Sequence, residues 1–316
     1  MKFKKNKNNF GQIRNGFGMG ILELVKSNKN IVALTGDLKD SLKLTEFAKS
    51  FKNNFFEFGI SEQNMMSAAV GMAINNKIPF VVSYAAFNPG RNWDQLRISV
   101  CYSNSNVKII GGHAGLTTGP DGATHQILED IAITRVLPNL TVIVPCDEEE
   151  AKKATIAIGK LNGPCYLRLT REKSLNITSQ DSDFEIGKAN ILKKGNDITI
   201  IACGVTVQFA LSAHDKLKKI GIKSTIINLH TIKPLDTKTI LKFAKLTNKI
   251  ITIEEHQKIG GLGSAISEYL SQHYPTKIEM IGIEDLFGES GDGYELLEKF
   301  NISEKEIIKR AKKLLK

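Results

Sequence analysis

The sequence lacks the features that mark several common protein classes. Its 316 residues include only four cysteines and no C-x-x-C pair, which excludes the usual zinc and dithiol redox motifs and favours buried, reduced thiols. Apolar runs stay far shorter than the ~20 residues that a membrane helix needs, so we expect no membrane association. Residues 1–9 carry four lysines but no following apolar region, which predicts a cytoplasmic protein without a secretory signal.

Composition and charge describe an ordinary globular protein. Hydrophobic residues make up 41% of the chain and charged residues 24%, and we find no internal repeat or low-complexity tract. At ~150 residues per domain, the length predicts two domains. The formal charge of +10 fits either a nucleic-acid partner or an anionic small substrate. Because the lysines are scattered and form no stripe interleaved with aromatic residues, we expect a solvated surface and no nucleic-acid partner.

Short apolar segments alternate with amphipathic ones, which is typical of a parallel sheet with helices on both faces. Up to Arg171 the pattern predicts strands at Ile31–Leu34, Phe55–Phe58, Pro79–Ser83, Val107–Ile110, Thr141–Val144 and Cys165–Leu169. It predicts helices at Gly18–Lys26, Thr45–Lys52, Glu62–Asn75, Asn92–Cys101, Ile127–Leu137 and Asp147–Leu161. We therefore expect an α/β protein whose first domain has three layers and a mostly parallel sheet.

The stretch Glu172–Lys188 is polar and weakly periodic, so we interpret it as a linker that ends a first domain at residues 1–188. In residues 189–316 the alternation resumes, with strands predicted at Ile198–Ala202, Ser224–Leu229, Lys249–Ile253 and Lys277–Ile281. Helices are predicted at Val207–Ile220, Thr237–Leu246, Gly263–His273 and Ser303–Leu315. We expect a second, smaller three-layer α/β domain.

Two glycine-rich segments resemble phosphate-binding loops without matching one. Gly260–Ser264 follows an apolar strand, but it lacks the G-x-G-x-x-G spacing and no G-K-[ST] follows, so we predict a tight turn that starts a helix. Gly291–Gly293 resembles the start of a diphosphate and metal motif. The asparagine that this motif needs downstream is absent at the right distance, and we predict a loop there.

Polar groups gather after three predicted strands, where open α/β sheets place their sites. In the first segment, Glu62 follows Ser61, a candidate N-cap, and a carboxylate favoured by the helix dipole is the simpler explanation of Glu62 taken alone. In the second, Tyr84 and Phe87 flank small residues, and core packing is the default for aromatic residues.

The third polar segment, Gly111–Gln126, is the most informative. It carries His113, Asp121 and His125 in a glycine-rich loop with few apolar residues, which makes poor core material and favours a site. A zinc site is disfavoured, because the spacings match no standard ligand set and no cysteine joins them.

These segments together resemble the pyrimidine-binding domain of transketolases. The resemblance lies in G-I-S-E-Q-N-M around Glu62, in S-Y-A-A-F-N-P-G-R and in G-H-A-G-L-T-T-G-P-D-G-A-T-H-Q. L-R-L-T-R, which ends at Arg171, and L-F-G-E-S-G, which ends at Gly291, are similar to the same family. The likeness covers Arg14–Leu315 but only the second and third of the three transketolase domains, so the chain resembles the C-terminal subunit of a split transketolase.

The resemblance implies a transferase that moves a two-carbon ketol unit from a ketose phosphate to an aldose phosphate with thiamine diphosphate. Glu62 matches the carboxyl group that binds N1′ of the aminopyrimidine and promotes loss of the C2 proton. Tyr84 and Phe87 match the aromatic wall on which the pyrimidine stacks. A third aromatic residue of that loop is replaced here, near Pro89 and Gly90.

The resemblance also implies residues that bind the sugar. His113 and His125 match histidines that hydrogen-bond and shuttle protons at its carbonyl and hydroxyl groups, and Asp121 matches a residue that orients a hydroxyl. The positions that match the binding site of the terminal phosphate are Arg171, Ser41 and Arg14.

The missing third domain implies a partner. The partner expected is an N-terminal transketolase subunit that carries the diphosphate-binding domain and ligates Mg²⁺ or Ca²⁺, with no metal ligand in this chain. In this family the coenzyme lies between two chains, so the active unit implied is an α2β2 heterotetramer.

Three alternatives stay open at this point. The β subunit of 2-oxo acid dehydrogenases shares the Glu62 segment but does not usually combine D-G-A-T-H-Q with a histidine at position 113. Deoxyxylulose phosphate synthase has D-G-x-T-H-Q but typically lacks that histidine and the F-G-E-S-G ending. A catalytically silent binding subunit is disfavoured, because Glu62, His113, Asp121 and His125 occur together.

Overall fold

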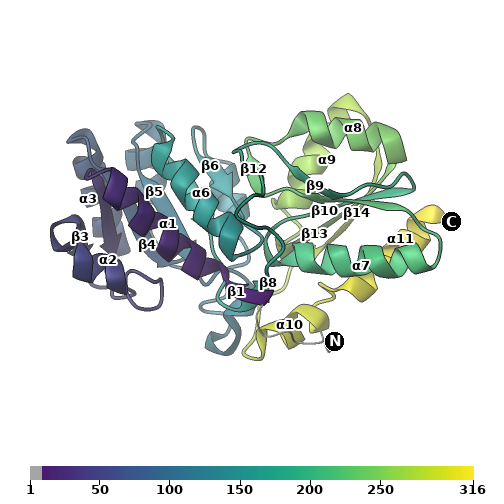
Figure 1. Cartoon of the computed structure of the whole chain (residues 1–316), viewed down its shortest axis with the longest axis horizontal. Coiled ribbons are helices and arrows are strands. Elements are labelled where there is room, and N and C mark those ends of the chain that lie inside the picture. The colour runs from purple at the N-terminus through teal and green to yellow at the C-terminus, as the bar shows by residue number, and fades with distance from the viewer. Residues whose placement is uncertain (1–8) are drawn as a thin grey trace.

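The computed structural model describes residues 9–316, and the lysine cluster of Lys2–Lys7 lies outside the described residues. Two mostly parallel sheets lie side by side, each with helices on both faces (Figure 1). The expected α/β architecture is confirmed. Within the described residues, no helix has the length and apolar character needed to cross a membrane.

The first sheet has seven strands in the order β12-β6-β7-β5-β4-β2-β3. Its strands are β2 (Ile31–Thr35), β3 (Phe55–Glu57), β4 (Ile78–Tyr84), β5 (Lys108–Gly112), β6 (Thr141–Ile143), β7 (Cys165–Arg168) and β12 (Thr231–Lys233). All pair in parallel except β12, which is antiparallel to β6. Because the central strands are covered on both faces, they read as continuous apolar runs: all five residues of β2 are buried.

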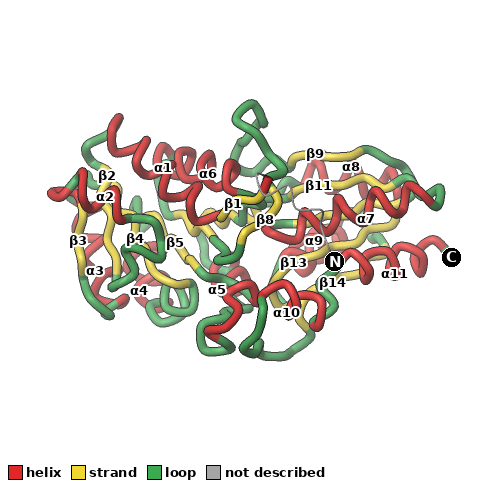
Figure 2. Tube along the Cα trace, turned by 60° about the horizontal axis from the view of Figure 1, so that its bottom comes forward, coloured by secondary structure: helices red, strands yellow, loops and turns green. Residues whose placement is uncertain are grey.

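Two groups of helices cover this sheet (Figure 2). One face packs against α1 (Ile13–Ser27), α2 (Thr45–Ser50) and α6 (Glu148–Lys160). The other packs against α3 (Glu62–Ile74), α5 (Asp130–Arg135) and a segment that combines α4 (Trp93–Gln95) with the π-helix η3 (Leu96–Tyr102). The predicted helix at Gly18–Lys26 in fact begins at Ile13. Its N-cap residue, Gln12, makes no side-chain capping bond, so no signal marks the start.

The second sheet has five strands in the order β14-β13-β10-β11-β9. They are β9 (Asn190–Lys193), β10 (Ile198–Ala202), β11 (Ser224–Asn228), β13 (Lys249–Gln257) and β14 (Lys277–Ile283). One face packs against α7 (Val207–Lys219) and α11 (Glu304–Leu315), and the other against α8 (Thr237–Thr247) and α9 (Leu262–His273). Helix α10 (Gly293–Lys299) packs against the segment Leu116–Asp121, which follows β5 of the first sheet. Short 3-10 helices occur at η2 (Lys52–Asn54), η4 (Leu116–Asp121) and η5 (Gly204–Thr206).

The sequence pattern does not predict five short elements of the structure. They are β9, β12, α10 and the antiparallel pair of β1 (Phe10–Gln12) with β8 (Lys173–Leu175). Strand β8 lies inside the segment predicted as a linker, so that segment is not wholly irregular. The residues predicted as a loop around Gly291 include a helix start, since the Asp292 carboxylate accepts hydrogen bonds from the N–H groups of Tyr294 (2.9 Å) and Glu295 (3.1 Å).

Candidate active site at the edge of the first sheet

The three polar segments singled out in the sequence meet at one edge of the first sheet. They follow β3, β4 and β5, which are parallel strands whose carboxyl ends share that edge. Tyr84 is the last residue of β4, His113 begins the loop after β5, and α3 begins at Glu62. The structure therefore brings together three segments that are well separated along the chain.

Glu62 is a buried carboxylate at the first position of α3. Its side chain is 1% exposed. One carboxylate oxygen lies 3.4 Å from the Ser83 hydroxyl, and the other accepts a 2.6 Å hydrogen bond from Nη1 of Arg91. Ser61 occupies the N-cap position, but its hydroxyl donates to the carbonyl of Phe58 (2.8 Å) and does not cap the helix. The Glu62 carboxylate is therefore buried, and one of its oxygens faces Arg91 in the loop after β4.

Four rings from the loops after β4 and β5 converge, and Arg91 links one of them, Phe87, to the Glu62 carboxylate. The rings of Tyr84 and Phe87 are stacked with centroids 6.2 Å apart. The imidazole of His113 lies 3.9 Å from the Tyr84 ring, and that of His125 meets the Phe87 ring edge-on at 5.3 Å. Two aromatic side chains and two histidines from separate loops thus form one cluster of rings.

His113 is held in an unusual conformation. Its φ of 53° lies in the left-handed region, which few residues other than glycine adopt. Nε2 lies 3.4 Å from Nη1 of Arg14, and Nδ1 is buried without a partner. Burial and, secondarily, the nearby Arg14 lower the pKa of His113 to about 3, so the imidazole is neutral near pH 7. A neutral ring with one free nitrogen is suited to accept a hydrogen bond from a ligand or to donate one to it.

The low pKa of His113 predicts acid sensitivity. The unfolded chain binds a proton at this residue below its ordinary pKa of about 6.5, whereas the folded chain resists protonation until about pH 3, so stability falls as the pH falls between these values. Between pH 6.5 and 5, the free energy of unfolding is expected to fall by about 2 kcal/mol less in His113→Asn than in the wild type, as measured by urea unfolding. His273→Asn, at an exposed position on α9, is the matched control. Identical pH slopes for His113→Asn and the wild type would contradict the expectation.

Cationic groups flank the rings. Nη1 of Arg14 donates to the backbone carbonyl of Ser41 (2.9 Å), while Nε of Arg14 is buried without a partner. Nη1 of Arg171 donates to the carbonyl of Thr118 (2.6 Å) and lies 4.0 Å from Asp121. The structure therefore brings every site residue predicted from the sequence into one region, although Ser41 contacts Arg14 through its backbone carbonyl and not through its hydroxyl.

The loop that carries His113, Asp121 and His125 is supported by the second sheet. The buried Glu255, on β13, accepts a 2.6 Å hydrogen bond from the N–H of Thr117. A side chain at Gly115 would collide with this carboxylate, because a Cβ there would lie 2.3 Å from its carboxyl carbon. Gln126 donates from Nε2 to the carbonyl of Glu289 (2.9 Å), just before α10. Residues of both sheets are therefore needed to shape the site.

Arg91 is a site residue that the sequence analysis did not predict. It lies in the aromatic loop, four residues after Phe87, and this i, i+4 spacing in a tight turn is the signal that could have identified it. Its guanidinium carbon lies 4.5 Å from the centroid of the Phe87 ring, in addition to the ion pair with Glu62.

The segment Gly260–Ser264 starts a helix, as predicted. The N–H groups of Leu262 and Gly263 donate hydrogen bonds to the Glu254 carboxylate (2.6 and 2.8 Å), so the N-terminus of this helix is occupied by a side chain of the protein.

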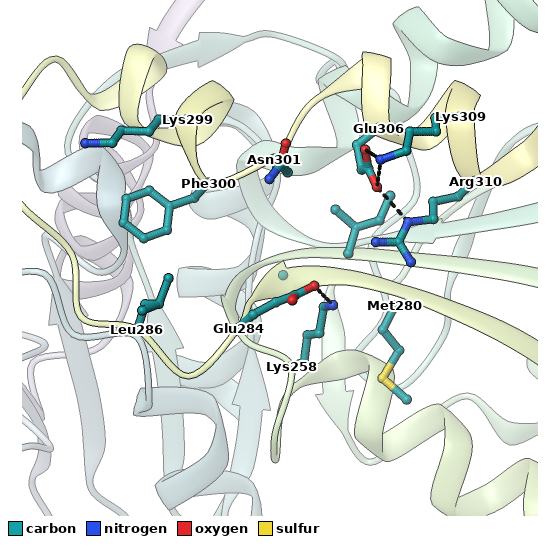
Figure 3. A pocket seen from close by; sticks show the side chains of 12 residues that line it. Lys258, Met280, Glu284, Leu286, Lys299, Phe300, Asn301, Glu306, Lys309 and Arg310 are labelled. Carbon is teal, nitrogen blue, oxygen red and sulfur yellow. Dashed lines mark hydrogen bonds and ion pairs between the residues drawn. The ribbon is translucent and has the colours of Figure 1, made fainter.

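Two cavities lie away from this site. One, of about 410 Å³, borders α11 and β14 (Figure 3). Three of its cationic side chains are already paired, Lys258 with Glu284 and both Lys309 and Arg310 with Glu306. The other, of about 570 Å³, is lined by residues of α3 and of the segment around Asn53. Among residues 9–316, no group of three or more His, Cys, Asp or Glu side chains is placed to hold a metal ion.

Comparisons with known proteins place this architecture in a family. The transketolase pyrimidine binding domain matches residues 11–175, and the transketolase C-terminal domain matches residues 187–307. Together the matches span most of the chain, so the chain belongs to the transketolase family.

Relatives of similar length include two transketolase subunits and a split gene transketolase. A 6-deoxy-6-sulfo-D-fructose transketolase subunit of Clostridium sp. is 38% identical over 92% of this chain and 90% of its own length. An apulose-4-phosphate transketolase subunit of Phocaeicola vulgatus is 36% identical over 98% of this chain and 99% of its own length. A solved split gene transketolase, an inactive β4 tetramer, superimposes with a TM-score of 0.90 at 39% identity, covering 96% of this chain and 98% of its own.

Proposed function

We propose that this chain is the C-terminal subunit of a two-chain transketolase, which transfers a two-carbon ketol unit from a ketose phosphate to an aldose phosphate with thiamine diphosphate. The observation that carries the proposal is the buried Glu62 carboxylate, which Arg91 links to the stacked rings of Tyr84 and Phe87. Family membership and the split-enzyme relatives support the division into two chains. Domain limits of 1–188 and 189–316 are part of the proposal, although β12 reaches back into the first sheet.

The residues present fit the pyrimidine end of the coenzyme. Thiamine diphosphate supplies carbanion chemistry at its thiazolium ring when bound. Glu62 would hold a proton at N1′ of the aminopyrimidine, and its burial excludes the water that would compete for that proton. Tyr84 and Phe87 would stack on the ring. We assign the diphosphate and its Mg²⁺ or Ca²⁺ to an N-terminal partner subunit, with an α2β2 assembly as the active unit.

The remaining side chains suit a phosphorylated sugar. The neutral His113 has a free Nδ1, and His113 and His125 both contact the Tyr84 ring, so both can hydrogen-bond the sugar's carbonyl and hydroxyl oxygens and pass protons between them. Asp121 would orient a hydroxyl group. Arg14 and Arg171 would bind the terminal anionic group, with the Ser41 segment positioning the Arg14 guanidinium.

The two-chain arrangement has a direct test. Purified alone, the chain is expected to show no ketol transfer across a panel of ketose and aldose phosphates, because it holds only part of the coenzyme site. Mixing it with an N-terminal transketolase subunit that carries the diphosphate-binding domain, together with thiamine diphosphate and Mg²⁺, is expected to produce turnover. Omission of each component in turn is the control. Robust transfer by the chain alone would refute the split arrangement.

A further inference from the structure

Arg91 makes both contacts that the proposed function assigns to the pyrimidine ring. Its Nη1 is 2.6 Å from Oε2 of Glu62, and its guanidinium carbon is 4.5 Å from the centroid of the Phe87 ring. The Arg91 side chain is 43% exposed, whereas that of Glu62 is 1% exposed. The only charged partner of the buried carboxylate among the described residues is therefore a side chain that is free to leave toward solvent.

The chemistry of the two groups explains why one can replace the other. A guanidinium is planar, offers N–H donors along its edge and stacks by its face on aromatic rings. An aminopyrimidine is also planar and would meet Glu62 by its edge and Phe87 by its face. Because one carboxylate oxygen and one ring face cannot serve both groups, binding of the pyrimidine requires the guanidinium to move.

The backbone of the loop does not need to move with it. The N–H of Arg91 donates to the carbonyl of Phe87 (3.2 Å), and Asn92 donates from Nδ2 to the backbone carbonyl of Glu62 (3.2 Å). At Gly90 a Cβ would lie 2.1 Å from the carbonyl oxygen of Ala86, so the turn requires glycine. The loop is thus fixed tightly against α3, and rotation of the Arg91 side chain alone frees the site.

We propose that Arg91 is a positioning residue that occupies the pyrimidine site of the coenzyme-free subunit and withdraws when the coenzyme binds. This inference rests on the proposed function. While in place, the guanidinium keeps the buried Glu62 carboxylate paired and covers the face of the Phe87 ring. Its presence lowers the apparent affinity for the coenzyme, which equals the affinity of the open site multiplied by the fraction of subunits in which the site is open.

The test uses thiamine diphosphate titrated into the assembled two-chain complex. Arg91→Met keeps an apolar stem over Phe87 but removes the guanidinium, and we expect it to tighten the dissociation constant about three- to ten-fold and to accelerate association. Arg97→Met, an exposed arginine on η3, makes the same charge change and is expected to leave both unchanged. In a Glu62→Gln background, Arg91→Met is expected to lose most of its effect.

Two further measurements separate the possible outcomes. In Arg91→Ala, added methylguanidinium is expected to compete with the coenzyme, and it is not expected to do so in the wild type. The melting temperature of the lone chain is expected to fall for Arg91→Met and not for Arg97→Met, since Glu62 is left unpaired.

Weaker or unchanged coenzyme binding by Arg91→Met would overturn the inference while leaving the proposed function intact. Coenzyme binding by the Arg91→Met complex but not by the wild-type complex would support the inference, since the Arg91 side chain would then close the site almost completely. Absence of binding by both complexes would overturn both proposals.

Discussion

Glu62→Ala is expected to abolish exchange of the C2 proton of thiamine diphosphate in the assembled complex and to reduce ketol transfer by at least about 10²–10⁴-fold. The reason is that Glu62 is a buried carboxylate that Arg91 links to the Phe87 ring, and the proposed function assigns to it the proton at N1′. The isosteric Glu62→Gln is expected to do the same, because an amide cannot share a proton with the ring. Deuterium exchange at C2, followed by NMR after rapid acid quenching, measures the effect.

The control must show that loss of activity does not reflect loss of assembly. Size-exclusion chromatography of each variant with its partner subunit is expected to give the elution volume of the wild-type complex. Glu46→Gln, an exposed glutamate on α2, makes the same chemical change away from the site and is expected to retain full activity. An unchanged exchange rate in Glu62→Gln would remove this residue from the mechanism.

The regular elements were predictable because their signals are local. Buried parallel strands such as β2 and β10 are short apolar runs, and several helices begin at residues whose side chains cap them, among them Asp147, Asp236 and Ser303. The short antiparallel strands were not predictable in this way. β1 is defined only by its pairing with β8, about 160 residues away, and β12 only by its pairing with β6. Each of β1, β8 and β12 has three residues with a single apolar side chain, whereas β3 and β6, which are equally short, lie in the predicted apolar runs.

The same distinction applies to the site. Glu62, His113 and Asp121 lie in segments whose polar composition after a strand marks them, and a sequence motif identifies them. The contact between Arg91 and Glu62, and the support of the His113 loop by Glu255, depend on tertiary packing. No local pattern encodes these contacts, because their partners are far apart in the sequence. Arg91 and Glu62 are 29 residues apart, and Thr117 and Glu255 are 138 residues apart. The catalytic roles themselves stay predictions until the variants are measured.

A buried ionic network joins the two sheets beneath this loop. Nε of Arg168, on β7, donates to Asp130 (2.8 Å), and Nη2 donates to the backbone carbonyl of Glu255 (2.8 Å). Tyr166 donates its hydroxyl to the same Asp130 oxygen (2.7 Å). Burial raises the pKa of Glu255, which Arg168 opposes. All of these side chains are almost fully buried, so each charge depends on the others for compensation.

Arg168→Met is therefore expected to destabilise the chain by about 3–5 kcal/mol, because it leaves two carboxylates buried without their cation. Lys305→Met, which breaks an exposed ion pair with Glu298, is expected to cost less than about 1 kcal/mol. Urea unfolding measures both.

Adding Asp130→Asn and Glu255→Gln to Arg168→Met is expected to recover part of the lost stability, since the uncompensated charges are then removed. Hydrogen exchange at Thr117 is expected to accelerate in Arg168→Met and not in Lys305→Met, because the Glu255 carboxylate that binds this N–H is no longer held. Equal stability of the two variants would show that the network contributes nothing beyond a surface pair.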